Sequence, residues 1–180
     1  MKAYRDIVLG EVGRALALIS EAASREFCRE LDRVRRRTVY ITGVGRSGLV
    51  VHAFGQRLMH LGFDVHLAQE VTAPAIRRGD LLVACSGTGT TLLPLYMARK
   101  ARKIGARVVS LTASPRSPLA KLSHLVILIP APLGGKGTRQ PARSLFEQTL
   151  FLYLDSVVLT AMHELRIPGR RLGRRHANLE

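Results

Sequence analysis

Short apolar runs alternate with helical patterns along most of the chain. Runs rich in Val, Ile and Leu predict strands at 38–42, 64–68, 81–85, 107–112 and 125–129. Between and after them, apolar residues recur every three or four positions. That spacing predicts helices at 47–61, 90–104, 117–122 and 144–165. Near-continuous apolar strands are typical of parallel sheets covered on both faces. The pattern therefore predicts a doubly wound α/β sandwich of three layers around a five-stranded parallel sheet.

The first 36 residues show a helical pattern of their own. Its apolar positions are Val8, Val12, Leu16, Ile19, Ala23, Phe27, Leu31 and Val34. This periodicity predicts one long amphipathic helix over 5–35. Such a helix either lies along its own sheet or packs partly on another subunit. With 180 residues, we expect a single domain, divided into the N-terminal helix at 1–36, the sheet core at 37–130, the last long helix at 144–166 and a tail at 167–180.

A hydroxyl-rich turn follows the predicted strand at 81–85. Its sequence is Cys85-Ser86-Gly87-Thr88-Gly89-Thr90-Thr91, and a helical pattern begins directly after it. Backbone N–H groups at a helix start are unpaired and carry partial positive charge, and glycines let the backbone close around an anion. The turn therefore predicts a phosphate-binding loop, although turns of this composition also occur without any ligand. The spacing and the lysine of a nucleotide P-loop are missing.

A second turn of the same kind follows the strand at 38–42. It reads Gly43-Val44-Gly45-Arg46-Ser47-Gly48. The G-x-G-x-x-G spacing also fits a dinucleotide fingerprint, and Glu70 lies where that fingerprint expects an acidic residue. The cation and the hydroxyl within the turn favour a compact phosphate over a pyrophosphate. Because the carboxyl ends of parallel strands meet at one edge of a sheet, we expect the two turns to converge.

The composition limits the other functions. The net charge of +15 favours anionic ligands, but no nucleic-acid-binding motif accompanies it, so we expect nucleic acid not to be the partner. Cys28 and Cys85 fall at positions typical of small core residues, and no metal-ligand spacing is present, so we expect no metal site. No signal peptide and no clean membrane-spanning run are evident, which predicts a cytoplasmic protein.

The two turns in order, over 39–91, resemble the sugar isomerase (SIS) domain family. Within that family, five segments resemble the 6-phospho-3-hexuloisomerases. They are Gly43-x-Gly45-Arg46-Ser47-Gly48, 57–62, Ser86-Gly87-Thr88-Gly89, Ser144-Leu145-Phe146-Glu147-Gln148 and 175–180. The resemblance implies a flavodoxin-like strand order and an isomerase that interconverts D-arabino-3-hexulose 6-phosphate and fructose 6-phosphate through an enediol. It also implies that no metal or organic cofactor is used. It further implies a homotetramer, built as a dimer of dimers, with functional coupling to a 3-hexulose-6-phosphate synthase in the ribulose monophosphate route of formaldehyde assimilation.

The resemblance also assigns site residues. The phosphate-binding positions are Gly45, Arg46, Ser47, Ser86, Gly87, Thr88 and Thr91. Glu147 corresponds to the catalytic base, and His176 on the tail to a residue that assists proton transfer, in its own site or a neighbouring subunit's. Glu70, Thr72 and His60 are candidates for contacts with the sugar, and His52 lies beside the first turn.

Several positions depart from the family pattern or admit another interpretation. Thr88 keeps a hydroxyl where the family usually has serine, whereas Thr90 removes a carboxylate, and Arg143 precedes the last helix in place of a family Gly. Ser144 and Glu147 also match a helix-capping box, which would give Glu147 a structural role. Two alternatives stay open: an isomerase for another sugar phosphate and a non-catalytic phosphosugar-binding module.

Overall fold

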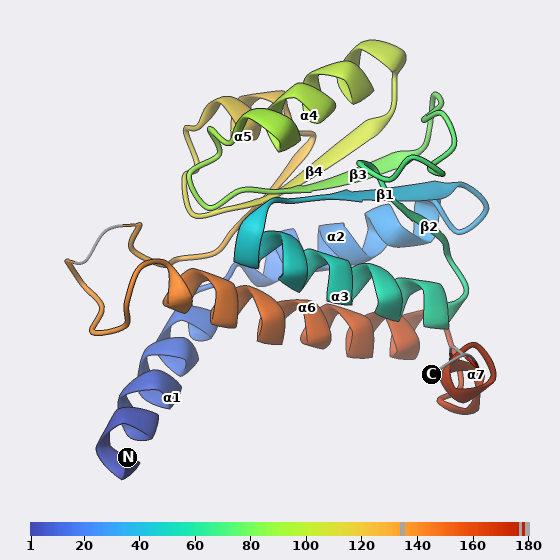
Figure 1. Ribbon diagram of the computed structural model, residues 1–180. Coiled ribbons are helices and arrows are strands. Elements are labelled where there is room, and N and C mark those ends of the chain that lie inside the picture. The colour runs from blue at the N-terminus through green and yellow to red at the C-terminus, as the bar shows by residue number, and fades with distance from the viewer. Residues whose placement is uncertain (134–135, 177, 179–180) are drawn as a thin grey trace.

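A five-stranded, all-parallel sheet forms the centre of the molecule (Figure 1). The computed structural model describes the chain except residues 134–135, 177 and 179–180. The strands are β1 (Thr38–Thr42), β2 (Asp64–Leu67), β3 (Leu81–Cys85), β4 (Arg107–Thr112) and β5 (Leu125–Leu128). Their order is β2-β1-β3-β4-β5. The predicted parallel sheet and its flavodoxin-like order are thus confirmed, and the predicted bounds differ by at most one residue.

Helices cover both faces of this sheet. On one face lie α4 (Leu92–Ile104) and the short α5 (Pro118–Leu122), and on the other lie α2 (Glu21–Arg33) and α3 (Gly45–Leu61) (Figure 1). The α6 helix (Ser144–Glu164) packs on α2, α3 and α1 (Lys2–Ala17). Each of β1, β3 and β4 is buried along nearly its whole length, as expected for strands covered on both faces.

The N-terminal segment forms two helices, so the prediction of one helix over 5–35 is wrong in this respect. α1 ends at Ala17 and α2 begins at Glu21. Ser20 has an extended backbone, and its hydroxyl oxygen accepts a 3.3 Å hydrogen bond from the backbone N–H of Ala23. This N-cap satisfies one of the unpaired donors at the start of α2. Apolar spacing continues across the break, which is why periodicity alone did not reveal it.

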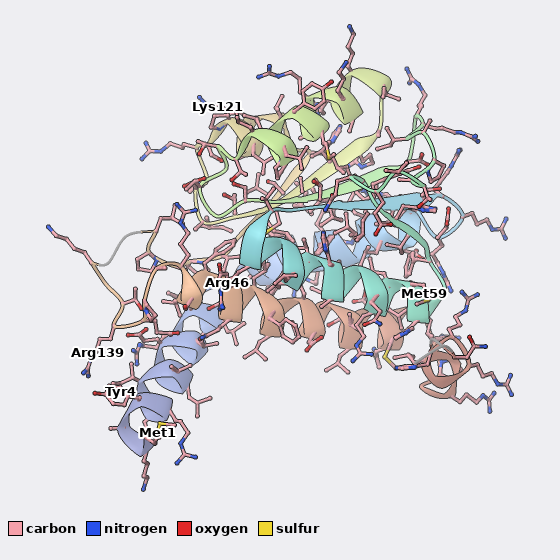
Figure 2. All side chains as sticks on the ribbon, viewed as in Figure 1. Met1, Tyr4, Arg46, Met59, Lys121 and Arg139 are labelled. Carbon is pink, nitrogen blue, oxygen red and sulfur yellow. The ribbon has the colours of Figure 1, made fainter. Side chains whose placement is uncertain are left out.

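The α1 helix extends away from the body of the molecule (Figures 1 and 2). Tyr4 and Leu9 on it are each 69% exposed, whereas Val12 and Ala15 are buried where the helix meets α6. Its contribution to the core therefore comes mainly from its C-terminal half, with Val8 as a partly buried contact from the other half.

The α6 helix is long and apolar enough to cross a membrane by length and composition, contrary to the expectation from the sequence. Nine of its residues, among them Phe146, Leu150 and Leu154, are buried against neighbouring helices. This packing accounts for the apolar residues on its buried side, whereas Phe151, Leu152 and Leu159 are exposed.

Candidate active site

The two hydroxyl-rich turns meet at the carboxyl edge of the sheet. They follow β1 and β3, which are hydrogen-bonded neighbours, and each leads directly into a helix. The first turn enters α3 at Gly45, and the second enters α4 at Leu92. The N-termini of two helices therefore open at the same edge, where their unpaired N–H groups favour an anion.

The first turn is folded tightly on itself. A Cβ added to Gly48 would lie 2.8 Å from the carbonyl oxygen of Gly43, so only glycine fits there. Ser47 is half-buried, and its hydroxyl donates to the Val44 carbonyl over 3.0 Å. Gly45 and Arg46 are exposed at the surface of the turn. The turn thus presents a hydroxyl, a cation and backbone N–H groups together.

Hydrogen bonds between its own hydroxyls order the second turn. The Ser86 and Thr91 hydroxyl oxygens are 2.8 Å apart, and Ser86 Oγ also accepts from the backbone N–H of Gly89 over 3.0 Å. Thr88 Oγ1 accepts from the Thr90 hydroxyl over 2.9 Å. The Thr88 hydroxyl therefore orders the side chain of Thr90.

The Glu147 side chain reaches the first turn from α6. Its carboxylate forms an ion pair with the guanidinium of Arg46, 101 residues away in sequence. The Glu147 side chain is 12% exposed and that of Arg46 67% exposed. Figure 2 shows Arg46 near the first turns of α3 and α6. The beginning of α6 therefore brings a largely buried carboxylate to the two turns.

This geometry contradicts the capping-box interpretation of Glu147. The N-cap of α6 is Arg143, not Ser144, and no side chain caps this helix. The backbone N–H of Glu147 bonds to the Arg143 carbonyl over 3.2 Å, while the carboxylate turns toward Arg46. Helix capping therefore does not explain the glutamate.

The second turn also contacts the beginning of α6. A Cβ added to Gly87 would lie 3.5 Å from the ring of Phe146, the residue before Glu147. Burial raises the pKa of the Cys85 thiol to about 12, opposed by a hydrogen bond with Ser47 and reinforced by the charge of Glu147. Cys85 is thus an inert core thiol, and both Ser47 and Glu147 act on it at the end of β3.

Comparison with known proteins identifies the family of the chain. The SIS domain model matches residues 34–154. The chain belongs to the SIS domain family. The 3-hexulose-6-phosphate isomerase of Mycobacterium gastri is 44% identical over 146 residues, covering 79% of this chain and 73% of that protein. The enzyme of the same name from Bacillus subtilis is 34% identical over 178 residues, covering 96% and 95%.

Solved structures share the complete fold. A protein from Methanococcus jannaschii, inferred to be a 3-hexulose-6-phosphate isomerase, superposes with a TM-score of 0.87 at 27% identity and 99% coverage of both chains. The NanR protein of Vibrio vulnificus, in complex with ManNAc-6P, has a TM-score of 0.81 at 20% identity, covering 96% of this chain and 66% of that one. The second likeness concerns the fold alone. The predicted family and fold are confirmed.

Two of the predicted site residues lie at the opposite end of this SIS domain. His60 is near the C-terminus of α3, about 22 Å from Gly45 at a rise of 1.5 Å per residue. His176 lies beyond α7 (Arg170–Arg174), and its ring stacks on that of His60 with 5.3 Å between centroids. Met59 marks this end of α3 in Figure 2. Within one chain, neither histidine is brought to Glu147.

The remaining predicted contacts line the rim of the same sheet edge. Glu70 and Thr72 are exposed in the turn that follows β2, the neighbour of β1. His52 on α3 is 2.9 Å from the Gln69 side chain, between ring and amide nitrogens. No side-chain hydrogen bond joins any of these residues to the first turn within the described part of the chain.

Sequence reasoning missed the residues that hold the loops around the site. The carboxylate of Glu11 on α1 accepts hydrogen bonds from the Thr138 hydroxyl (2.6 Å), the Arg139 backbone N–H (2.9 Å) and the Gln140 amide (3.1 Å). These bonds lower the pKa of Glu11, against a smaller opposing effect of desolvation. An acidic residue on the otherwise apolar side of α1 was the available signal. Across the described residues, no group of three or more His, Cys, Asp or Glu is arranged to hold a metal ion.

Proposed function

We propose that this protein is an isomerase that interconverts D-arabino-3-hexulose 6-phosphate and fructose 6-phosphate. The observation that carries the proposal is the Glu147 carboxylate, which is largely buried beside two phosphate-type turns and is not used in helix capping. The similarity to proteins named 3-hexulose-6-phosphate isomerase, at up to 44% identity, specifies the substrate.

The substrate's phosphate is bound by the two turns. The hydroxyls of Ser47, Ser86, Thr88 and Thr91 donate to its oxygens, and backbone N–H groups come from Gly45 at the N-terminus of α3 and from Gly87 within the second turn. The hydroxyls already bond to one another and to backbone, and a hydroxyl can rotate toward a new acceptor. The phosphate provides binding energy remote from the reacting carbons, which orients them against Glu147.

Glu147 transfers the proton. Moving the carbonyl from carbon 3 to carbon 2 requires removal of the hydrogen on carbon 2 beside the ketone, which gives an enediol. Return of the proton to carbon 3 then leaves the ketone at carbon 2. One carboxylate can make both transfers from the same side, because the two carbons are adjacent. The hydroxyl protons move between O2 and O3, a step that suits a histidine.

His176 acts in this scheme from a neighbouring subunit. Its position at the far end of its own chain supports this assignment, since it cannot serve the same chain's Glu147 there. Leu92 and Tyr96 on α4 are 83% and 58% exposed next to the second turn, and such apolar side chains are suited to a subunit contact. A cytoplasmic homotetramer coupled to 3-hexulose-6-phosphate synthase completes the proposal, with His60, Glu70 and Thr72 as sugar contacts at the assembled site.

A coupled assay tests the function. Ribulose 5-phosphate and formaldehyde are converted by 3-hexulose-6-phosphate synthase, and fructose 6-phosphate is followed in the presence of EDTA. We expect turnover by the wild type and a loss of about 10²–10⁴-fold in kcat for Glu147→Gln, with phosphosugar binding retained. Glu164→Gln, at the exposed end of the same helix, is the matched control and should be fully active.

The other outcomes separate the alternatives. If the wild type gives no turnover but sugar phosphates raise its Tm, the protein acts on a different sugar phosphate or only binds one. If Glu147→Gln loses binding together with activity, the carboxylate shapes the site and is not the base.

A further inference from the structure

Arg46 and Glu147 belong to two different parts of the proposed machinery. Arg46 lies in the first turn, where the phosphate binds, and Glu147 is the base. In the structure without substrate their side chains contact each other, through Arg46 Nε–H and Glu147 Oε2. Among the described residues, neither side chain forms an ion pair with any other residue. The cation that is placed to receive the phosphate therefore holds the carboxylate that must receive a proton.

We propose that the Arg46–Glu147 pair is a latch that the substrate's own phosphate opens. While the phosphate subsite is empty, Arg46 occupies the carboxylate of Glu147. When a phosphate dianion binds, Arg46 turns to it and leaves Glu147 free to act. The inference rests on the proposed function, and it adds that phosphate binding and base activation are coupled through one arginine.

The two partners differ in a way that suits this exchange. The Arg46 side chain is 67% exposed and so remains solvated, whereas Glu147 is 12% exposed. Ion pairs with an exposed partner are weak, so the guanidinium can leave at little cost. A guanidinium binds phosphate through two parallel N–H···O bonds, and the dianion carries twice the charge of a carboxylate. The N-termini of α3 and α4 further favour the anion, so phosphate competes successfully for Arg46.

Once Arg46 has left, the Glu147 carboxylate can accept the substrate's proton. The carboxylate oxygen that accepts the Arg46 N–H has that lone pair occupied, and it can take a proton from the substrate there only after this hydrogen bond is broken. Removal of that donor only after the phosphate has bound keeps Glu147 inactive toward sugars that lack a phosphate. Specificity for phosphosugars thereby arises in the chemical step as well as in binding.

A double-mutant cycle on the affinity for inorganic phosphate tests the latch without any requirement for turnover. Phosphate binding is measured by calorimetry at neutral pH and constant ionic strength for the wild type, Arg46→Gln, Glu147→Gln and the double variant. Circular dichroism and Tm verify that each is folded. Arg46→Lys is added because lysine keeps the charge but loses the planar fork.

If the latch exists, Glu147→Gln frees Arg46 and binds phosphate about three- to tenfold more tightly than the wild type. Arg46→Gln binds at least about tenfold more weakly. In the Arg46→Gln background, Glu147→Gln tightens binding by much less, because no arginine remains to be freed. Arg46→Lys should fall between the wild type and Arg46→Gln.

Simple repulsion between Glu147 and phosphate predicts the opposite order. Without Arg46 the carboxylate is not neutralised, so its removal would then help phosphate at least as much as in the wild-type background. That result, or no effect of Glu147→Gln on phosphate affinity, overturns the latch. The coupled assay tests the proposed function separately. Coupling between Arg46 and Glu147 without hexulose turnover would contradict the isomerase proposal, and turnover without that coupling would contradict only the latch.

Discussion

Gly89 lies so close to Ser117 that a Cβ added to the glycine would be 2.0 Å from the serine hydroxyl oxygen. Ser117 is the N-cap of α5, and its hydroxyl oxygen accepts a 3.3 Å bond from the backbone N–H of Ala120. The Leu119 backbone N–H in turn donates to the Gly89 carbonyl over 3.1 Å. The second turn is therefore shaped by its contact with the beginning of α5, a contact that only a glycine permits.

We expect Gly89→Ala to disable the second turn. Gly89 has a φ of +65°, which an alanine adopts at a cost, and the new methyl would overlap Ser117. Together these effects should cost about 2–5 kcal/mol of unfolding free energy, measured by urea denaturation, and phosphate affinity should fall with it. Gly45→Ala is the matched control, since Gly45 has a φ of +62° but nothing within 4 Å of the added methyl. It should cost only about 1–2 kcal/mol. Equal costs for the two variants would show that the overlap is relieved.

Most of the fold could be predicted from the sequence because its strands are buried on both faces. Strands such as Leu81–Cys85 and Arg107–Thr112 stand out as apolar runs between turns, and their bounds were predicted correctly. The break between α1 and α2 was not predicted. The apolar spacing continues across it, and the main local sign of the new helix is the capping hydrogen bond of Ser20. Local backbone chemistry of this kind leaves little trace in periodicity.

The site was predicted in part for a similar reason. Turns at the carboxyl ends of neighbouring parallel strands must converge, so Ser47 and Ser86 could be placed together without coordinates. The direction of the Glu147 side chain could not be predicted, because the sequence Ser144 to Glu147 fits a helix-capping box as well as it fits a catalytic role for Glu147. The structure resolves this ambiguity through Arg46, a residue 101 positions away that no local pattern connects to Glu147.

Glu11 should make the loop that leads to α6 sensitive to acid. Hydrogen bonds from the Thr138 hydroxyl and from the backbone N–H of Arg139 lower its pKa below the ordinary glutamate value of 4.5. A carboxyl whose pKa is depressed by folding stabilises the native state above its unfolded pKa, and this stabilisation is lost as the pH falls through the folded value. We therefore expect the Tm difference between the wild type and Glu11→Gln to be present at neutral pH and to vanish in acid below pH 4.5. A difference that stays constant with pH would contradict an anchoring role for the charge.

Glu30 is a buried carboxylate held by Arg107. The Glu30 side chain is 1% exposed, and Arg107 at the start of β4 contacts both carboxylate oxygens at 2.5 Å. We expect Arg107→Met to cost about 3–5 kcal/mol in urea unfolding, because it leaves a buried charge with Arg33 as its remaining ion-pair partner among the described residues. Adding Glu30→Met should recover most of that loss, since an apolar pair needs no compensating charge. Costs that simply add would show that Arg107 stabilises the fold by packing alone.

Mixing two inactive variants tests whether His176 acts in a neighbouring subunit. Its ring stacks on His60 at the end of α3 remote from Glu147, so a role in catalysis requires a second chain. If sites form between chains, a pair made of one Glu147→Gln chain and one His176→Ala chain contains one site with both defects and one with neither. Random association in a dimeric unit should then restore about a quarter of the wild-type activity after co-expression, although each variant alone is inactive. His163→Ala, a histidine substitution on the exposed side of α6, is the control and should need no partner. If the mixed preparation stays inactive while native mass spectrometry shows mixed assemblies, His176 does not complete a neighbour's site, and its contact with His60 is structural.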